Sequence, residues 1–593
     1  MAQYSRLVIT NDGQALMAKM IAGSGNIDFT KMCSSSTQYQ ENQLQDLTAI
    51  SDIKQTTLVS KVSRTNNVAI KVEAAFSNAD ITTGYYMRTL GLYAVDPDKG
   101  EILYAACIET TNNCYMPPYN GVTVSAAYIQ VYTTVGNAES VSLEVNPGAY
   151  ATIGDIQALE AEIADLEAFI GYSDEDIFGV EVDFVNKKFT RLSGAVNRTP
   201  GAGFDSINAF GGRKRCNVAD DGTVTAYYGD SGYTTTGKNA AGTPVQVMVE
   251  QPKFYYKVVP MVLEKGVKGM KIRKARYYVS DTLKPGFKVH PAFVENGNVN
   301  PYIYLAAFEG SLFDSSANAY ILDNAQVADF AADKLSSIAG TKPADGDTQN
   351  LTRANTRLLA RKRGSGWEQA YAATAAASQL LMLIEYASFN MQTAIGRGNT
   401  DQGSSAANIQ YTGATVSLGN ASGAVTNANG IQLISYRGEE NFWGNIWTWV
   451  DGMNEENPDP FESGQAGTLH VADHGFADNS KASPYKNTGI HPIQGSGYVS
   501  AFGYSEEFDW LFIAVEYSGN SSLPVGDYAW NNNSGWRVAK LGGCCANGSD
   551  AGAFYWYLYN AASYHGWGLG GRLVYVPSKK GSRSVTVEQG LKN

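Results

Sequence analysis

The chain of 593 residues is poor in cysteine, in positive charge and in long apolar runs. Its six cysteines are sparse and unpatterned, which favours synthesis in the cytosol without a disulfide framework. No stretch approaches the ~20 apolar residues of a membrane-spanning helix, because LLMLIEYASF (380–389) is short and contains Glu385. The N-terminal sequence MAQYSRLVITND lacks the basic and apolar regions of a signal peptide. We therefore expect no membrane insertion.

The net charge and composition of the chain indicate which classes of binding partner to expect. The 45 lysines and arginines are outnumbered by 57 acidic residues, which gives a net charge of −12. No Lys/Arg-rich stretch offsets this deficit, so a nucleic-acid or anionic-membrane partner is not expected. Glycine is plentiful at 61, and the 36 tyrosines outnumber the 22 phenylalanines and nine tryptophans combined. These features predict several domains of the α+β class, mostly β, with large binding surfaces.

Motifs for catalysis and metal binding are scarce. The sequence has no GxSxG and no phosphate-binding loop, and carboxylate pairs such as Glu439–Glu440 are weak evidence for a depolymerase. His470 and His474 are spaced as a helical metal pair, but the flanking Gly and Asp favour a loop. Cys544 and Cys545 suggest a zinc or redox feature, yet no second pair accompanies them. We expect no metal, no cofactor and no enzymatic activity.

Residues 526–576 interleave two kinds of position. The framework positions are Trp530, Trp536, Gly542, Gly543, Gly552, Phe554, Trp556, Gly570, Gly571, Arg572 and Leu573. Between them lies an irregular mixture of small, polar and aromatic residues, namely Asn531, Asn532, Asn533, Cys544, Cys545, Ser549, Asp550, Tyr557, Tyr559, Tyr564, His565, Gly566 and Gly568. Such residues dominate paratopes because Tyr gives rigid contact area while the small polar residues adapt. The segment is predicted to be a binding surface on a rigid scaffold.

The framework of this segment resembles that of the variable proteins of diversity-generating retroelements, whose C-terminal domain has a C-type-lectin fold. The matching runs are GWRVA (535–539), LGG (541–543), NGSDAGAFYW (547–556) and GGRLVYV (570–576). In that family, template adenines are miscopied, so Asn codons scatter into Tyr, His, Asp, Ser, Gly, Cys and Ala. The resemblance implies that the interleaved positions form a diversified ligand-binding surface.

Strand geometry sharpens this prediction. Successive side chains of a strand point to opposite faces, so the tyrosines should face away from the framework residues that alternate with them. We expect one contiguous solvent-exposed face formed by Asn532, Cys544, Ser549, Tyr557, Tyr559, Tyr564 and His565. Phe554, Trp556, Leu558 and Trp567 are expected on the opposite, inner side.

Residues 1–148 are predicted to form a separate domain. A turn at Asn11–Gly13 precedes an amphipathic helix, and DPDKG (96–100) separates two apolar alternating runs as in a hairpin. Together with ITNDG (9–13), GYYMRTLGLYA (84–94) and GEILYA (100–105), these features resemble the N-terminal domain of phage tail-collar fibre proteins. The resemblance implies attachment to the tail or baseplate of a virion.

Residues 149–172 contain a short heptad pattern. Apolar residues alternate by three and four positions at Ile156, Leu159, Ile163, Leu166 and Ile170. This is the seam of a two-heptad coiled coil, and the alternative is one amphipathic helix packed on its own subunit. Ile at a with Leu at d leans toward dimers. Fibres are generally trimers, so the resemblance implies a homotrimer.

Residues 173–577 are predicted to form one elaborated C-type-lectin-like domain, followed by a polar tail at 578–593. Its first half resembles the lectin type shared with formylglycine-generating enzymes. The sequence predicts a hairpin around Asp221–Gly222 and two helices in 356–398. The expected core face of these helices comprises Trp367, Tyr371, Leu380, Leu383 and Ile384. Phe442, Trp443, Trp447 and Trp449 are expected beside the binding face.

Two classes of function stay open. The first is a receptor-binding tail fibre, located on the virion tail, whose diversified tip binds a bacterial cell-surface protein or glycan. Its other partners would be tail or baseplate proteins and copies of itself. The second is a fibre-borne enzyme, either a polysaccharide depolymerase or an oxidase of the formylglycine-generating type.

Overall fold

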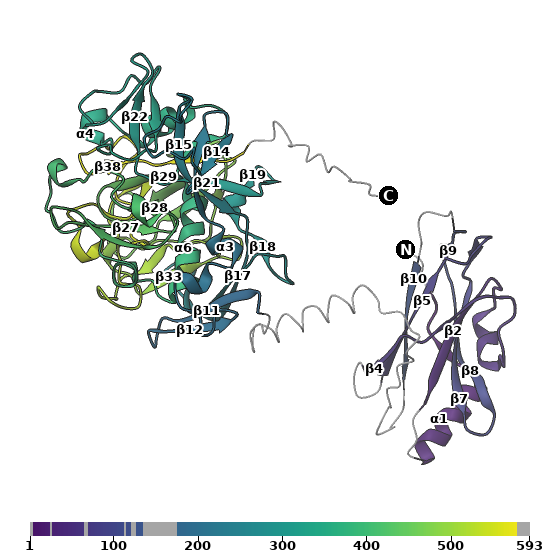
Figure 1. Ribbon diagram of the computed structural model, residues 1–593. Coiled ribbons are helices and arrows are strands. Elements are labelled where there is room, and N and C mark those ends of the chain that lie inside the picture. Colours follow the sequence, from purple (N-terminus) through teal and green to yellow (C-terminus); the bar gives the residue numbers. More distant parts are fainter. Residues whose placement is uncertain are drawn as a thin grey trace, which may run out of the picture. The chain divides into compact units, whose positions relative to one another are not determined.

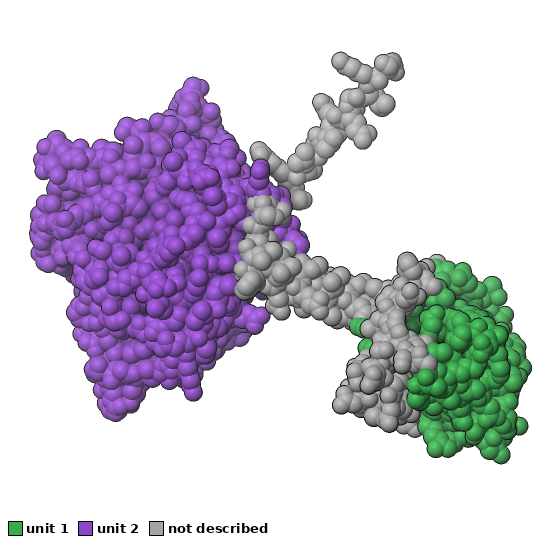
Figure 2. Space-filling model, turned by 90° about the horizontal axis from the view of Figure 1, so that it is seen from below, with its two compact units in different colours: residues 1–163 green, residues 164–593 purple. Residues whose placement is uncertain are grey.

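The chain divides into two compact units, Met1–Ile163 and Ala164–Asn593, in a computed structural model (Figure 2). The structure describes residues 4–23, 27–64, 69–111, 114–119, 126–134 and 175–577. The predicted coiled coil, with Ile156, Leu159, Ile163, Leu166 and Ile170, and the polar tail at 578–593 lie outside the described residues. Strands greatly outnumber helices in both units, which confirms the mostly-β expectation.

The described residues of the first unit form one α-helix and two main sheets. Helix α1 (Asn11–Gly23) begins at Asn11, so the predicted turn at Asn11–Gly13 is the first turn of the helix. A five-stranded sheet has the order β1 (Val8–Ile9), β8 (Gly100–Ile108), β7 (Thr89–Asp96), β2 (Phe29–Ser35) and β3 (Ile53–Leu58). A second sheet has the order β10 (Ala126–Thr134), β5 (Ala69–Ser77) and β4 (Lys61–Arg64), and β6 (Tyr85–Tyr86) pairs with β9 (Tyr115–Met116). Asp96 pairs with Gly100, which confirms the hairpin predicted at DPDKG.

Within residues 175–577, the second unit contains three large sheets, several strands of which are labelled in Figure 1. The six-stranded sheet has the order β14 (Val224–Tyr227), β13 (Lys214–Ala219), β15 (Val245–Pro252), β21 (Tyr302–Ala306), β39 (Leu573–Tyr575) and β25 (Trp367–Gln369). The seven-stranded sheet has the order β12 (Lys188–Ser193), β11 (Ile177–Asp183), β17 (Met270–Ser280), β16 (Tyr255–Lys265) and β18 (Lys288–Val289). In addition, β33 (Ala501–Tyr504) pairs with β17, and β34 (Ala514–Glu516) pairs with β33. Pairing of β13 with β14 confirms the hairpin predicted around Asp221–Gly222.

The eight-stranded sheet contains four of the five strands of the 526–576 segment. Its order is β31 (Lys486–Asn487), β30 (Thr468–Val471), β29 (Trp447–Asn457), β36 (Gly535–Leu541), β37 (Trp556–Tyr557), β35 (Tyr528–Asn531) and β32 (Gly495–Tyr498), and β38 (Leu569–Gly570) pairs with β29. Smaller sheets join β19 (Val294–Glu295) to β20 (Asn298–Val299), β22 (Ser311–Asp314) to β23 (Ala319–Ile321) and β24 (Lys334–Ser336), and β27 (Gln432–Tyr436) to β26 (Gly423–Thr426) and β28 (Glu439–Glu440).

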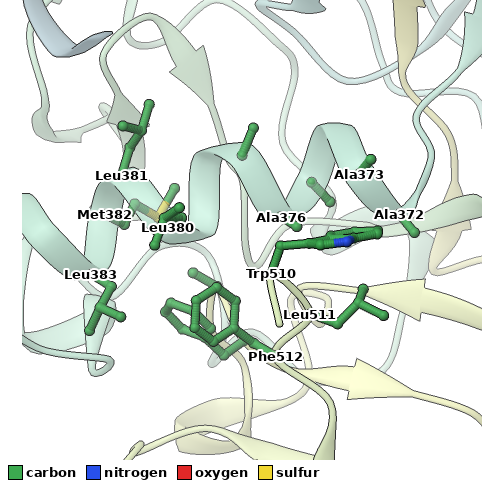
Figure 3. Packing of buried hydrophobic residues seen from close by; sticks show 14 of the residues in the cluster. Ala372, Ala373, Ala376, Leu380, Leu381, Met382, Leu383, Trp510, Leu511 and Phe512 are labelled. Carbon is green, nitrogen blue, oxygen red and sulfur yellow. The ribbon is translucent and has the colours of Figure 1, made fainter. Parts of the chain in front are cut away.

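Helix α6 (Ala372–Tyr386) lies in the core of the second unit (Figure 1). It contacts β11 and β17 of one sheet and β29 of another. Its alanines and leucines belong to one hydrophobic cluster with Trp510, Leu511 and Phe512, and the Trp510 ring lies beside Ala372 and Ala376 (Figure 3). Alanine favours the helix and leaves room for close packing at its N-terminal half. Glu385 is buried and pairs with Arg437 at 2.7 Å, which satisfies its charge. Burial on every side therefore explains the apolar run at 380–389.

The two helices predicted in 356–398 are α5 (Arg353–Arg361) and α6, and a short α7 (Met391–Ala394) follows them. The predicted core residues Trp367, Tyr371, Leu380, Leu383 and Ile384 are all buried. Two further short helices, α3 (Asn208–Gly211) and α4 (Gly346–Gln349), lie in loops. Among the residues described, no helix combines the length and apolar character that crossing a bilayer requires.

Candidate binding face

Alternation along the chain divides the segment into an inner and an outer side. Trp556 and Leu558 are 2% and 3% exposed, while Tyr557 and Tyr559 are half-buried and reach solvent. Phe554 is buried as well, and Trp567 is half-buried rather than inside. The predicted alternation is therefore confirmed at Tyr557 and Tyr559.

Two buried contacts hold this segment in place. Gln379 of α6 donates a hydrogen bond to the Ala553 carbonyl at 2.7 Å, and Asp527 accepts one from the Phe554 amide at 2.7 Å. Gly552 is required here, because a Cβ would lie 2.0 Å from the Asp527 carboxylate. Burial raises the pKa of Asp527 well above its ordinary value. The start of β37 is thus fixed by the core helix and by the loop before β35.

The outer side forms an aromatic face, defined here as Tyr498, Tyr528, Trp530, Tyr557, Tyr559 and Tyr564. The ring centroid of Trp530 lies 5.9 Å from that of Tyr557 and 6.3 Å from that of Tyr559. The Tyr557 and Tyr559 rings are 5.9 Å apart. Trp530, which the sequence assigned to the framework, therefore belongs to the face. Its indole is half-buried.

Two members of the aromatic face were missed by the sequence prediction. Tyr528 stands two residues before Trp530 in β35, so the same alternation rule could have found it. Tyr498 lies in β32, outside 526–576, and pairs with Tyr528 with ring centroids 5.2 Å apart. The pairing of β32 with β35 brings Tyr498 to the face, and the sequence around Tyr498 does not predict this position.

Lys540 lies beneath the aromatic face and was also missed. Its Nζ is 4.5 Å from the ring centroid of Trp447, 4.1 Å from Tyr557 and 5.6 Å from Tyr564. The residue is 6% exposed, and no described residue forms a hydrogen bond or ion pair with the amine. Burial lowers the pKa of Lys540 to about 7, while the three rings attract its charged form. The face therefore has a titratable amine at its centre.

Several predicted surface residues are instead buried. Cys544 is 6% exposed, Asn531 is 2% exposed and Cys545 is fully buried, and Gly566 is also buried. Asn531 points inward because β35 alternates, and its amide donates a 2.7 Å hydrogen bond to Glu455. Burial raises the pKa of Glu455 to about 8, so the carboxyl holds a proton at neutral pH. The solvent-facing position predicted for Cys544 is wrong.

The other predicted residues reach solvent around the aromatic face. Ser549, Tyr564 and His565 are exposed, and Asn532, Asn533, Asp550 and Gly568 are partly exposed. Ser549 lies 2.8 Å from the Tyr498 hydroxyl, and the Asn533 amide donates to the Tyr559 carbonyl at 3.2 Å. Lys540 connects Tyr557 to Tyr564. Six of the seven residues expected on the face are accessible, and these contacts join Ser549, Tyr557, Tyr559 and Tyr564 to other residues of the face.

The tryptophan-rich strand lies beneath the aromatic face. All four of its predicted aromatic residues are buried, namely Phe442, Trp443, Trp447 and Trp449. The Trp447 ring packs edge-on against the rings of Tyr555 and Tyr557. His470 lies in strand β30 rather than in the predicted loop, and His474 contacts Asp473 at 2.6 Å. Within the described ranges, no group of three or more His, Cys, Asp or Glu residues could hold a metal ion.

Known proteins give only distant matches. No protein-family model matches the chain, and no curated protein matches its sequence. Three solved structures of the Major Tropism Determinant match at 11–12% identity and each cover 61% of this chain. The U1 variant has a TM-score of 0.23 with 72% of its own chain covered, and the P3c and M1 variants have 0.21 with 71%. At these TM-scores the matches do not establish a shared fold, and the functional assignment depends on the residues of the chain itself.

Proposed function

We propose that the chain is a phage receptor-binding protein whose aromatic face binds a bacterial cell-surface molecule. The observation that carries this proposal is the cluster of Trp530, Tyr557 and Tyr559. Their rings lie 5.9–6.3 Å apart and are half-exposed, while Trp556 and Leu558 of the same run are buried. The surface can therefore change without disturbing the core below it.

The chemistry of the face suits protein or glycan recognition. Tyr and Trp dominate the energetics of binding interfaces because they offer large, rigid, amphipathic contact area. Burial raises the pKa of the Tyr557 hydroxyl to about 12, so the group stays neutral and able to donate. Ser549, Asn532 and Asn533 add adaptable polar groups at the margin. Together these residues form a surface of the kind found in paratopes.

The rest of the chain has a supporting role in this proposal. Residues 1–148 would join the protein to the virion tail, and residues 149–172 would gather three copies along one axis. Single contacts by a diversified surface are expected to be weak, and linked sites raise avidity by roughly 10²–10⁴. The proposed partners are thus a bacterial receptor, tail or baseplate proteins and two further copies of the chain.

We favour binding over catalysis. The oxidase alternative would require accessible, reactive cysteines, whereas Cys545 is fully buried and Cys544 is 6% exposed. The two thiols are also adjacent in sequence rather than brought together from separate elements. No depolymerase is proposed, since no observation on the carboxylate pairs favours one.

The coding DNA tests the diversified character of the face. Its 3′ segment should align with a nearby template repeat beside a reverse transcriptase gene. Differences between the two copies should fall at adenines in the codons of Asn532, Tyr557, Tyr559 and other accessible positions. Differences spread equally over the codons of Trp556 and Leu558 would overturn the proposal, as would the absence of any repeat.

A further inference from the structure

An open pocket of about 560 Å³ lies at one end of the six-stranded sheet, and none of its lining residues belongs to 526–576. Strand pairing places Lys214 opposite Glu250, and Glu250 opposite Tyr304. Pro252 pairs with Tyr302. Because alternate residues of a strand share a face, these side chains stand on one face of the sheet. The neighbouring strands β15 and β21, labelled in Figure 1, form the floor of this pocket.

A carboxylate with a free oxygen lines the pocket. Glu250 is 9% exposed, and its Oε2 accepts hydrogen bonds from the hydroxyls of Tyr227 at 2.9 Å and Tyr304 at 3.0 Å. Its Oε1 accepts none from any residue in the described part of the chain. Burial and the hydrogen bond to Glu250 raise the pKa of the Tyr227 hydroxyl, so this group remains a donor. The free oxygen is therefore a strong, oriented acceptor for a ligand hydroxyl.

Two exposed tyrosines flank this acceptor. Tyr228 and Tyr302 are each 40% exposed although both line the pocket. Gly419 permits the observed position of Tyr228, because a Cβ at that position would lie 2.4 Å from the ring. Asn420 also lines the pocket, and its Oδ1 is fixed by the Arg215 amide at 2.8 Å. The Tyr228 ring packed on Gly419 and the hydrogen-bonded amide of Asn420 thus line the same pocket as the carboxylate.

We propose that this pocket is a second binding site, which takes a neutral saccharide. A sugar ring has an apolar C–H face that packs on a tyrosine ring, and a rim of hydroxyls that donate to carboxylates and amides. The lining holds one cation, Lys214, and two carboxylates, Glu250 and Asp230, so it disfavours an acidic ligand and offers both donors and acceptors to sugar hydroxyls. The site is built from residues outside the diversified segment. It would let the protein hold a constant surface glycan while the aromatic face changes.

A glycan array carrying neutral, acidic and amine-bearing bacterial oligosaccharides tests this proposal with the full-length chain. We expect binding to neutral oligosaccharides, weakened about tenfold or more by Tyr302→Ala and by Glu250→Gln. Glu250→Gln keeps the size of the side chain and changes its charge, so it separates loss of the acceptor from loss of the fold. Thermal unfolding of each variant confirms that the sheet is intact.

Two control variants separate this site from the aromatic face. Tyr119→Ala removes a tyrosine that is also 40% exposed, but in the first unit, and should leave saccharide binding unchanged. Tyr559→Ala should also leave it unchanged. If Tyr559→Ala abolishes saccharide binding while Tyr302→Ala does not, the sugar binds the aromatic face and the second site is refuted, although the proposed function survives. The proposal also fails if only amine-bearing ligands bind, if no neutral saccharide binds, or if Tyr302→Ala and Glu250→Gln bind as the wild type does.

Discussion

The Lys540 amine lies 4.1 Å from the ring centroid of Tyr557, directly beneath the tyrosine that we place at the centre of the binding face. Pairing of β36 with β37 sets Lys540 opposite Tyr557, and Trp447 of β29 covers the amine from another side. The same strands that build the scaffold therefore place a buried amine under the surface. A change in the charge of Lys540 should therefore alter both the free energy of unfolding and the electrostatic environment of the aromatic face.

The first prediction concerns the pH dependence conferred by Lys540. Its pKa in the folded protein is about 7, below the ordinary 10.5, so the unfolded chain binds more protons between these values. The penalty for burying the charged amine is thus fully present below pH 7 and declines as pH rises toward 10.5. Lys540→Met should stabilise the second unit by about 1–3 kcal/mol at pH 6, and less at pH 9.

Urea unfolding at the two pH values measures this effect. Lys481→Met, at a lysine whose side chain is 59% exposed, is the matched control and should change stability little at either pH. An equal gain from Lys540→Met at pH 6 and pH 9 would show that charge burial is not its cause.

The second prediction concerns Glu455, which lies beneath Asn531. Its folded pKa is about 8, above the ordinary 4.5, so the folded state holds the proton more tightly. The stabilising contribution is complete below pH 4.5 and is lost as pH rises toward 8. Glu455→Gln cannot titrate, so the fall in unfolding free energy between pH 5 and pH 8 should be smaller by about 1–3 kcal/mol. Unchanged pH dependence in this variant would contradict the assignment. Glu456→Gln, at a partly exposed carboxylate that pairs with Lys481, is the control for the removal of one negative charge.

The third prediction separates core from surface aromatics. Trp556→Ala and Trp447→Ala should each destabilise the second unit by about 3–5 kcal/mol, because they remove buried rings. Tyr559→Ala and Tyr564→Ala should shift the melting temperature by only a few degrees, since both rings reach solvent. Calorimetry of the four variants provides the test. If all four variants lower the melting temperature by similar amounts, the division into buried scaffold residues and surface residues is wrong.

The fourth prediction concerns assembly. Sedimentation should show the intact chain as a trimer at micromolar concentration, and Ile163→Asp with Leu166→Asp should loosen it. Charges at two seam positions oppose the packing of apolar residues along the shared axis. If the wild-type chain sediments as a monomer, the prediction that it self-associates is wrong. If it sediments as a dimer, only the predicted number of copies is wrong.

Local patterns in the sequence predicted the elements that depend on local physics. Alternation separated Tyr557 and Tyr559 from Trp556 and Leu558, and turn residues located the hairpins at 96–100 and 221–222. Tyr528 and Trp530 follow the local alternation of β35 and were missed all the same, whereas the other missed features depend on contacts between distant segments. Asn531 is held inside by Glu455, and the rings around Lys540 come from Trp447, Tyr557 and Tyr564. Composition alone could not show that Cys544 would be packed beneath this face.

Binding of the full-length chain to host bacteria tests the central claim most directly. Bound protein can be measured for the wild type, for a Tyr557→Ala and Tyr559→Ala double variant, and for Tyr119→Ala as the exposed-tyrosine control. We predict that the double variant binds at least about tenfold more weakly, because it removes the two central rings of the aromatic face, whereas the control binds normally. Equal binding by the double variant and the wild type would contradict the claim that this face recognises the host.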